Sequence, residues 1–168
     1  MAEDEGRFGL ISVMRRCWAP YPLRPTVPQQ MVYEATYVFA AVCPQLGRIT
    51  ALILPYANSD MMTLFLRQVA SDLPDYFIVM LVDQAGWHLG KDVDVPENIR
   101  LIPQPAGSPE LNPAEHIWED LRENEIGNQL FTSLDELEET LCRGIKRLAS
   151  HPDTLRSLTD FPYLKLRL

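Results

Sequence analysis

Residues 76–83, with the sequence YFIVMLVD, decide the fold class of this chain. From Phe77 to Val82 the run is apolar, and a continuous apolar run of this length is typical of a strand covered on both faces of a sheet. Asp83 follows at the carboxyl end of the predicted strand, where open α/β sheets place their ligand sites. A charged residue is rarely allowed there unless it is paired, hydrogen-bonded or bound to a metal ion. The position alone is equally compatible with a turn or capping aspartate.

The segments on either side of this strand predict four more strands and several helices. Strand patterns precede it, a helix begins at an Asn-Ser-Asp cluster and ends at Pro74, and a short strand and further helices follow. A mixed α/β sheet of about five strands with helices on its faces accounts for this order. A ribonuclease-H-like arrangement fits it, and other α/β layouts have similar patterns. The predicted strands are residues 3–13, 32–42, 48–54, 76–82 and 98–102, with a hairpin turn at 44–47, and the predicted helices begin at 58–60, span 112–125 and 133–149, and follow Pro152.

The composition is typical of a single soluble globular domain spanning residues 1–168, with 46% hydrophobic and 23% charged residues. No apolar run approaches the roughly 20 residues of a membrane span, and the start lacks a signal-peptide pattern, so no membrane association is expected. The three cysteines form no CxxC pair, which favours a reduced, cytoplasmic protein and argues against zinc.

The net charge of -8 argues against tight DNA binding by this chain on its own. Polyphosphate binding is driven largely by Lys and Arg, and the chain has 15 of them against 23 acidic residues. The charge is compatible with a catalytic core whose affinity for DNA resides in another domain.

A second acidic residue of interest, Glu115, lies in the segment SPELNPAEHIWEDL at residues 108–121. Asn112 is a good helix N-cap, Pro113 suits the first helical position, and Glu115 falls at the third, as in a capping box. Glu115 is therefore interpreted either as a cap for its own helix or as a rigidly held carboxylate aimed at a strand edge, which a metal site needs. Trp118 is predicted to pack in the core.

Asp4 lies between Glu3 and Glu5 in the first predicted strand. Because side chains alternate along a strand, Asp4 is expected on the opposite face from both neighbours. An acidic N-terminal segment is also compatible with a solvated tail. Together, Asp4, Asp83 and Glu115 could bind a pair of hard cations such as Mg²⁺ through oxygen ligands. Two such ions activate the attacking oxygen and stabilise the leaving oxygen of a phosphodiester.

Four motifs, in this order, resemble the catalytic domain of bacterial insertion-sequence transposases in the mariner superfamily. They are EDEGRFG, RRCWAPYPLRP, LVDQAGWH and SPELNPAEHIWEDLRENEI, and the resemblance runs from Asp4 to about Leu148. It implies a ribonuclease-H-like fold and a D-D-E triad of catalytic residues on Asp4, Asp83 and Glu115, which would hold two Mg²⁺ or Mn²⁺ ions. The implied chemistry is cleavage of transposon-end DNA and transfer of the liberated 3′ hydroxyl into target DNA, usually at a TA dinucleotide.

The resemblance also implies partners. Relatives carry helix-turn-helix DNA-binding modules before the catalytic domain, and these modules are expected to be absent here. The expected partners are terminal inverted repeats and target DNA, an upstream DNA-binding polypeptide, and a second copy of the chain in a homodimer on DNA. The expected location is the bacterial cytoplasm, at the nucleoid when DNA is bound. Two alternatives stay open: a catalytically inactive remnant that at most dimerises or binds a partner, and a nuclease that hydrolyses DNA without strand transfer.

Five further residues are candidates for DNA contacts or for support of the metal ligands. His88 matches the family motif and is interpreted as approaching DNA or orienting a ligand, with structural packing beside Trp87 as the alternative. Glu119 lies on the same helix face as Glu115 and is a reserve ligand. The others are Asn112, expected to be a helix cap first, and Arg15 and Arg16, expected to meet phosphates or to be solvated surface charges.

Overall fold

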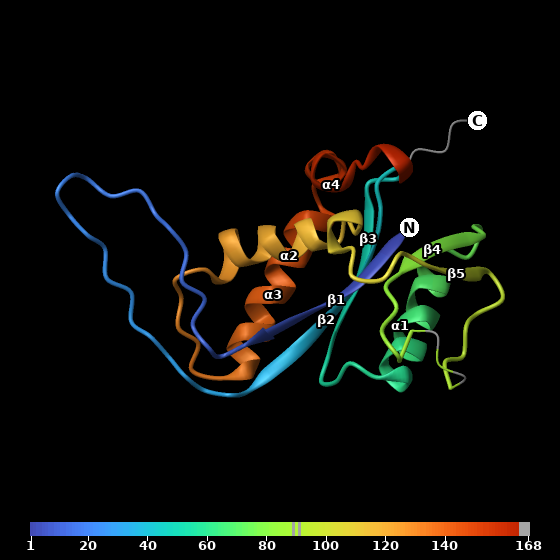
Figure 1. The fold of residues 1–168 in the computed structure, drawn as a ribbon, viewed down its shortest axis with the longest axis horizontal. Coiled ribbons are helices and arrows are strands. Elements are labelled where there is room, and N and C mark those ends of the chain that lie inside the picture. The colour runs from blue at the N-terminus through green and yellow to red at the C-terminus, as the bar shows by residue number, and fades with distance from the viewer. Residues whose placement is uncertain (89, 91, 165–168) are drawn as a thin grey trace.

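The computed structural model describes residues 1–164 apart from residues 89 and 91, and its centre is a five-stranded sheet (Figure 1). The strands are β1 (Ala2–Gly9), β2 (Ala35–Cys43), β3 (Arg48–Leu54), β4 (Ile78–Val82) and β5 (Ile99–Pro103). Their order is β3-β2-β1-β4-β5. β1 and β3 are both antiparallel to β2, whereas β4 runs parallel to β1 and β5. The predicted mixed sheet is confirmed.

An extended arm, residues 10–34, joins β1 to β2 and projects from the body of the molecule (blue in Figure 1). β1 ends at Gly9 and β2 begins at Ala35, so both strands are shorter on this side than the predicted strands 3–13 and 32–42. The prolines of the arm lack backbone N–H groups and cannot donate to a strand ladder. Two backbone hydrogen bonds continue past the strand ends, from Leu10 N–H to the Glu34 carbonyl at 3.0 Å and from Ser12 N–H to the Gln30 carbonyl at 3.1 Å. No ladder forms further out, where the prolines lie.

The hairpin between β2 and β3 has the predicted turn at residues 44–47. Cys43 pairs with Arg48 across it, and Gly47 has φ +61, a conformation that glycine adopts without steric cost. β3 has the predicted bounds because both its alternation and its glycine turn are local features of the chain.

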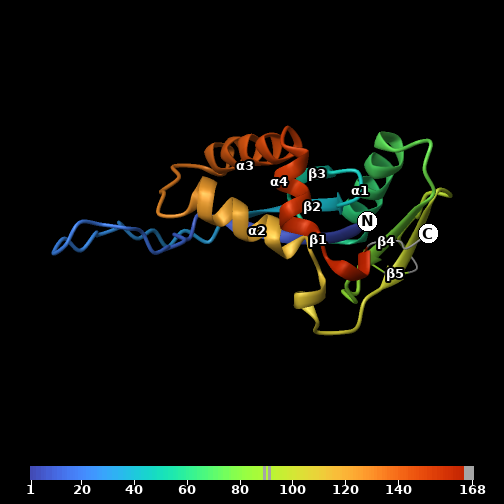
Figure 2. The same ribbon diagram turned by 90° about the horizontal axis from the view of Figure 1, so that it is seen from above.

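Helices cover the two faces of the sheet as separate groups (Figure 2). On one face, α1 (Ser59–Asp72) packs against side chains of β2, β3, β4 and β5. On the other face, α2 (Glu115–Leu121), α3 (Leu134–Ala149) and α4 (Pro152–Thr159) pack against β1 and the remaining side chains of β2. Within the described part of the chain, no helix is both long enough and apolar enough to cross a membrane.

Capping side chains set the starts of α1 and α3. Asn58 Oδ1 accepts a hydrogen bond from the backbone N–H of Met61 at 2.9 Å. The hydroxyl of Ser133 accepts one from the N–H of Glu136 at 3.3 Å. Each cap satisfies a backbone donor that the helix itself leaves without a partner, so these two helices begin where their sequences predict.

The predicted helix 112–125 is wrong in its limits. A single 3₁₀ turn, η1 (Pro109–Leu111), is followed by Asn112 in an extended conformation, and α2 begins at Glu115. At its other end α2 continues into a π-helical turn, η2 (Arg122–Ile126). Asn112 lies before this start, with its side chain bonded both to strand β1 and to the N–H of Ala114.

β4 is fully covered on one face and only partly on the other, which corrects the prediction of a strand covered on both. Ile78, Met80 and Val82 face α1 and are buried, whereas Val79 on the opposite face is 45% exposed. The reason is the placement of α2, α3 and α4, which pack mainly on β1, β2 and β3 and reach β4 only at Leu81.

Candidate active site

The three predicted catalytic acids come from three elements and line one pocket of about 320 Å³. Asp4 lies in β1, Asp83 follows β4 directly, and Glu115 is the first residue of α2. Gln104 and Asn112 line the same pocket. The structure therefore brings together three carboxylates that are separated by up to 111 positions in the sequence, as the motifs predicted.

The sheet register explains why Asp4 and Asp83 meet. Ala2 pairs with Leu81 where β1 begins and β4 ends, and the backbone N–H of Leu81 donates to the carbonyl of Met1 at 2.9 Å. Asp4 and Asp83 each lie two residues beyond that pair. The site is thus at the carboxyl end of a parallel strand, where open sheets place ligands.

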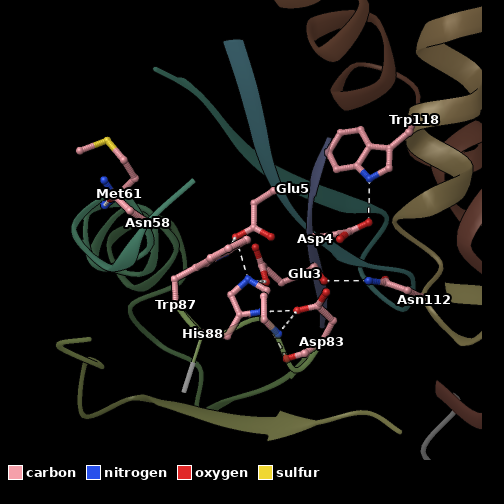
Figure 3. A network of polar contacts seen from close by, with 11 residues as sticks. Glu3, Asp4, Glu5, Asn58, Met61, Asp83, Trp87, His88, Asn112 and Trp118 are labelled. Carbon is pink, nitrogen blue, oxygen red and sulfur yellow. Dashed lines mark hydrogen bonds and ion pairs between the residues drawn. The ribbon is translucent and has the colours of Figure 1, made fainter. Parts of the chain in front are cut away.

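Trp118 sets the orientation of Asp4. Its indole Nε1 donates a hydrogen bond to Asp4 Oδ2 at 2.8 Å, and the side chain is 1% exposed (Figure 3). Burial is the largest influence on Asp4 and raises its pKa from 3.8 to about 7; the hydrogen bond from Trp118 opposes the shift, and the charges of Glu115 and Glu5 add to it. The predicted core role of Trp118 is confirmed, and the contact with Asp4 adds to it.

His88 and the backbone hold Asp83 from the other side. Asp83 Oδ1 accepts the N–H of Ala85 at 2.8 Å and lies 2.6 Å from His88 Nδ1. The second ring nitrogen, Nε2, lies 2.7 Å from Glu5 Oε1 (Figure 3). Burial lowers the pKa of His88, but Glu5 and Asp83 together raise it above its usual value. His88 is 1% exposed, so its contacts favour orientation of a ligand over direct contact with DNA.

Asn112 ties strand β1 to the segment that carries Glu115. Its Nδ2 donates to the carbonyl of Glu3 at 2.9 Å, and its Oδ1 accepts the N–H of Ala114 at 3.1 Å. No side-chain hydrogen bond caps α2, so Glu115 does not close a capping box with Asn112. The expected cap role of Asn112 is met only in part: its Oδ1 accepts the N–H of Ala114, but α2 begins later, at Glu115, and its Nδ2 is bonded across the sheet.

The other candidate residues lie outside the pocket. Glu119 is not a lining residue and pairs with Arg15 at 3.1 Å. Arg15 also pairs with Glu123 at 3.1 Å, so its charge is balanced within the chain. A residue four positions along a helix is about 6 Å further along its axis, which takes Glu119 beyond the pocket. Arg16 is exposed near the base of the arm, and its contact with phosphates stays a prediction.

A second cluster, Glu3, Glu5 and His88, lies on the face of β1 opposite Asp4 (Figure 3). One donor atom from each residue can be chosen so that all three lie within 4.8 Å of one another; among the described residues, Asp4, Asp83 and Glu115 do not form such a group. Glu3 is 0% exposed. Burial, followed by the charges of Glu5, Asp4 and Asp83, raises the pKa of Glu3 well above its usual value. Strand alternation predicted that Glu3 and Glu5 lie on the face opposite Asp4. The alternative interpretation of the acidic N-terminal segment as a solvated tail is wrong, because Glu3 is buried.

Comparisons with known proteins identify the class. The model of the DDE superfamily endonuclease family matches residues 2–138, and the chain belongs to that family. A protein of Sinorhizobium fredii (strain NBRC 101917 / NGR234), y4pE/y4sA, is 36% identical over 123 residues, which cover 73% of this chain and 91% of that protein. The family that the motifs indicated is therefore confirmed.

Solved structures of the Mos1 transposase share the fold. The strand transfer complex matches with a TM-score of 0.63 at 16% identity, over 96% of this chain and 55% of that chain. The mariner paired-end complex with Mn matches with a TM-score of 0.62 at 16% identity, over 95% and 55%. The chain thus spans about half the length of these solved relatives. The ribonuclease-H-like arrangement predicted from the order of elements agrees with this shared fold.

Proposed function

We propose that this chain is the catalytic domain of a transposase that cuts transposon-end DNA and transfers the 3′ hydroxyl into target DNA, in a reaction that depends on divalent metal ions. The observation that carries the proposal is the meeting of Asp4, Asp83 and Glu115 around one pocket at the end of β4. Membership of an endonuclease family and the fold shared with a strand transfer complex and paired-end complexes support it.

The residues of the pocket fit divalent cations. Their oxygen ligands are those that Mg²⁺ and Mn²⁺ prefer. Among the solved Mos1 structures with this fold are a paired-end complex with Mn and one with Mg. Burial and neighbouring acids raise the pKa of Asp4 to about 7, so a bound cation would favour its ionised form. When bound, a pair of cations would supply the charge that favours both the attacking and the leaving oxygen of a phosphodiester. The ligands would be Asp4, Asp83 and Glu115.

The chain's own residues would keep these ligands in place. Trp118 holds Asp4 from α2, while His88 and the N–H of Ala85 hold Asp83. Asn112 joins the backbone of β1 to the start of α2. Supporting contacts of this kind keep reactive groups within a narrow range of geometry before substrate arrives.

The proposed macromolecular partners are DNA, an upstream DNA-binding polypeptide and a second copy of the chain. The net charge of -8 supports a separate source of affinity for DNA. The exposed arm, whose Trp18 and Tyr21 are fully exposed, offers aromatic surface for a homodimer on DNA. The proposed setting is the bacterial cytoplasm, at the nucleoid when DNA is bound.

The test is Mn²⁺-dependent nicking of supercoiled plasmid by the full chain. We expect Asp4→Asn, Asp83→Asn and Glu115→Gln each to lower the rate by at least about a hundredfold, because each removes charge from the reacting centre. Glu119→Gln is the matched control, since it makes the same change one turn further along the helix and outside the pocket. Retained nicking in both Asp83→Asn and Glu115→Gln contradicts the assignment. Joined plasmid products separate strand transfer from hydrolysis alone.

A second candidate is a non-catalytic remnant that dimerises or binds a partner. Two observations favour it: the acidic net charge, and the engagement of Asp83 Oδ1 by His88 at 2.6 Å. A folded wild-type chain that neither binds Mn²⁺ in the pocket nor nicks plasmid, even with terminal-repeat DNA present, would support this candidate over the first.

A further inference from the structure

The carboxylate of Glu3 is the least satisfied polar group of the described core. Its residue is 0% exposed, and neither Oε1 nor Oε2 has a hydrogen-bond partner. A buried carboxylate without a partner is costly in either protonation state, because the acid form also needs hydrogen bonds. An orphaned buried group of this kind calls for a ligand that the described protein atoms do not supply.

The neighbours of Glu3 are metal-ligating groups. His88 Nε2 lies 3.7 Å from Glu3 Oε2 and 2.7 Å from Glu5 Oε1, and donor atoms of all three residues lie within 4.8 Å of one another. Trp87 donates to Glu5 Oε1 at 3.1 Å and closes one side of the cluster. Two carboxylates and an imidazole can thus converge on one point.

The charge of the cluster also calls for a cation. Among the described residues, the ion pairs of Glu3 and Glu5 are made with His88 alone. Asp83 is 2.6 Å from the other nitrogen of the same ring, so one imidazole faces three carboxylates. Buried carboxylates are stabilised by protonation, by pairing or by a bound metal ion, and a cation here would favour the ionised form of both glutamates.

We propose that Glu3, Glu5 and His88 form a buried site for one divalent first-row transition-metal ion, of which Zn²⁺ is the representative. Imidazole together with carboxylates suits such ions, whereas Mg²⁺ prefers oxygen ligands alone. The site is distinct from the Asp4 pocket, because β1 directs Glu3 and Glu5 to its other face. The absence of a CxxC pair, which argued against zinc, does not bear on this site, because the site contains no cysteine.

The geometry gives this ion a structural role next to the pocket. Ligation through Nε2 leaves the Nδ1–H of His88 free to donate to Asp83, and metal-bound histidines commonly donate their second N–H to a carboxylate. The ion would join β1 to the loop after β4 and hold Asp83 in its orientation. This proposal does not depend on catalysis by the chain.

The test uses the full chain loaded with Co²⁺, which replaces Zn²⁺ and shifts the proton resonances of its ligands. The expected result is one strongly shifted, slowly exchanging imidazole N–H resonance, because His88 is buried and hydrogen-bonded to Asp83. The chain has three histidines, and the variant H116Q/H151Q leaves His88 as the only one. This variant is expected to keep the signal, and excess Mg²⁺ is expected not to remove it.

Ligand variants then separate this site from the pocket. Asp4→Asn with Glu115→Gln should keep the signal, whereas Glu3→Gln, Glu5→Gln and His88→Gln should each lose it and weaken Zn²⁺ binding by more than about tenfold. Zn²⁺ should also raise the melting temperature of wild type but not that of Glu3→Gln. Any one of four outcomes overturns the proposal: wild type shows no shifted resonance, H116Q/H151Q loses it, the pocket double variant loses it, or Glu3→Gln keeps it. If Glu3→Gln does not fold, Glu5→Gln and the wild-type spectrum decide.

Discussion

Trp118 of α2 donates its indole N–H to Asp4 of β1 across 2.8 Å, and this contact joins the packing of the core to the pocket. The ring also packs edge-on against Phe8, with centroids 5.9 Å apart. A side chain that fills the core therefore also fixes the orientation of a candidate metal ligand. Changes in packing at this point should reach the pocket.

Trp118→Phe keeps an aromatic ring but removes the donor to Asp4. We expect it to cost about 1–3 kcal/mol of stability, because a half-buried carboxylate loses a hydrogen bond from the core. The hydrogen bond from Trp118 lowers the pKa of Asp4, so the variant should raise that pKa further and weaken Mn²⁺ binding near neutral pH. Chemical denaturation and Mn²⁺ titration at several pH values measure both effects. Trp18→Phe, at a fully exposed position, should leave both unchanged.

Stability of the metal-free chain should depend on pH through Asp4. Burial raises the pKa of Asp4 to about 7, so the folded chain binds more protons at this residue than the unfolded chain between about pH 4 and about pH 7. The contribution of Asp4 to stability therefore falls as pH rises through that window. Asp4→Asn should reduce this dependence and raise the free energy of unfolding above pH 7 by a few kcal/mol, at about 1.4 kcal/mol per pKa unit. Urea unfolding in the presence of a chelator at pH 5 and pH 8 measures the difference. Parallel curves for the two proteins would contradict it.

Gly6 is pressed against the same core tryptophan. A Cβ at this position would lie 2.7 Å from Phe8 Cε2 and 2.8 Å from Trp118 Cδ2, so two packed rings would have to move. Gly6→Ala should cost about 1–3 kcal/mol by overpacking and should also weaken Mn²⁺ binding by displacing Trp118. Gly86→Ala is the control, because a Cβ there meets nothing within 4 Å. Thermal unfolding and Mn²⁺ titration of both variants test this, and equal stability of the two variants would contradict the packing argument.

Asn112 connects two segments of backbone near the pocket. Asn112→Ala leaves the carbonyl of Glu3 and the N–H of Ala114 without this partner in a buried place, so we expect a loss of about 2 kcal/mol or more. The start of α2 should loosen, and Mn²⁺ affinity should fall because Glu115 is held less firmly. Asn124→Ala, at an exposed position of the neighbouring turn, serves as the control. Unfolding free energies and Mn²⁺ affinities that match between the two variants would show that Asn112 does not position the site.

The limits of several elements could be predicted because local interactions set them. β3 keeps its predicted bounds, residues 48–54, since its turn depends on Gly47, and α1 begins where Asn58 caps it. The start of α2 could not be predicted in this way. Its apparent cap, Asn112, is bonded to the backbone of a residue 109 positions away.

The sequence predicted that three acids meet at one pocket, but it did not predict the residues that support them. Asp83 and Glu115 lie in distinctive motifs, and the structure brings them to one pocket with Asp4. Glu119 shares the helix spacing of a ligand, yet it pairs with Arg15 of the arm. Helical periodicity predicts which side of the helix Glu119 faces. It does not predict that Arg15 lies beside it, because the path of the arm depends on long-range packing.

By itself, the sequence determined the class of fold, the family and the three acids of the pocket, because motifs, strand alternation and turn residues are encoded over a few neighbouring positions. Only the tertiary structure decided what surrounds those acids. The parallel pairing of β1 with β4 brings Glu5 beside His88, and the packing of α2 on β1 brings Trp118 to Asp4. Contacts between residues 83 or more positions apart arise from the register and packing of whole elements, which no short stretch of sequence contains.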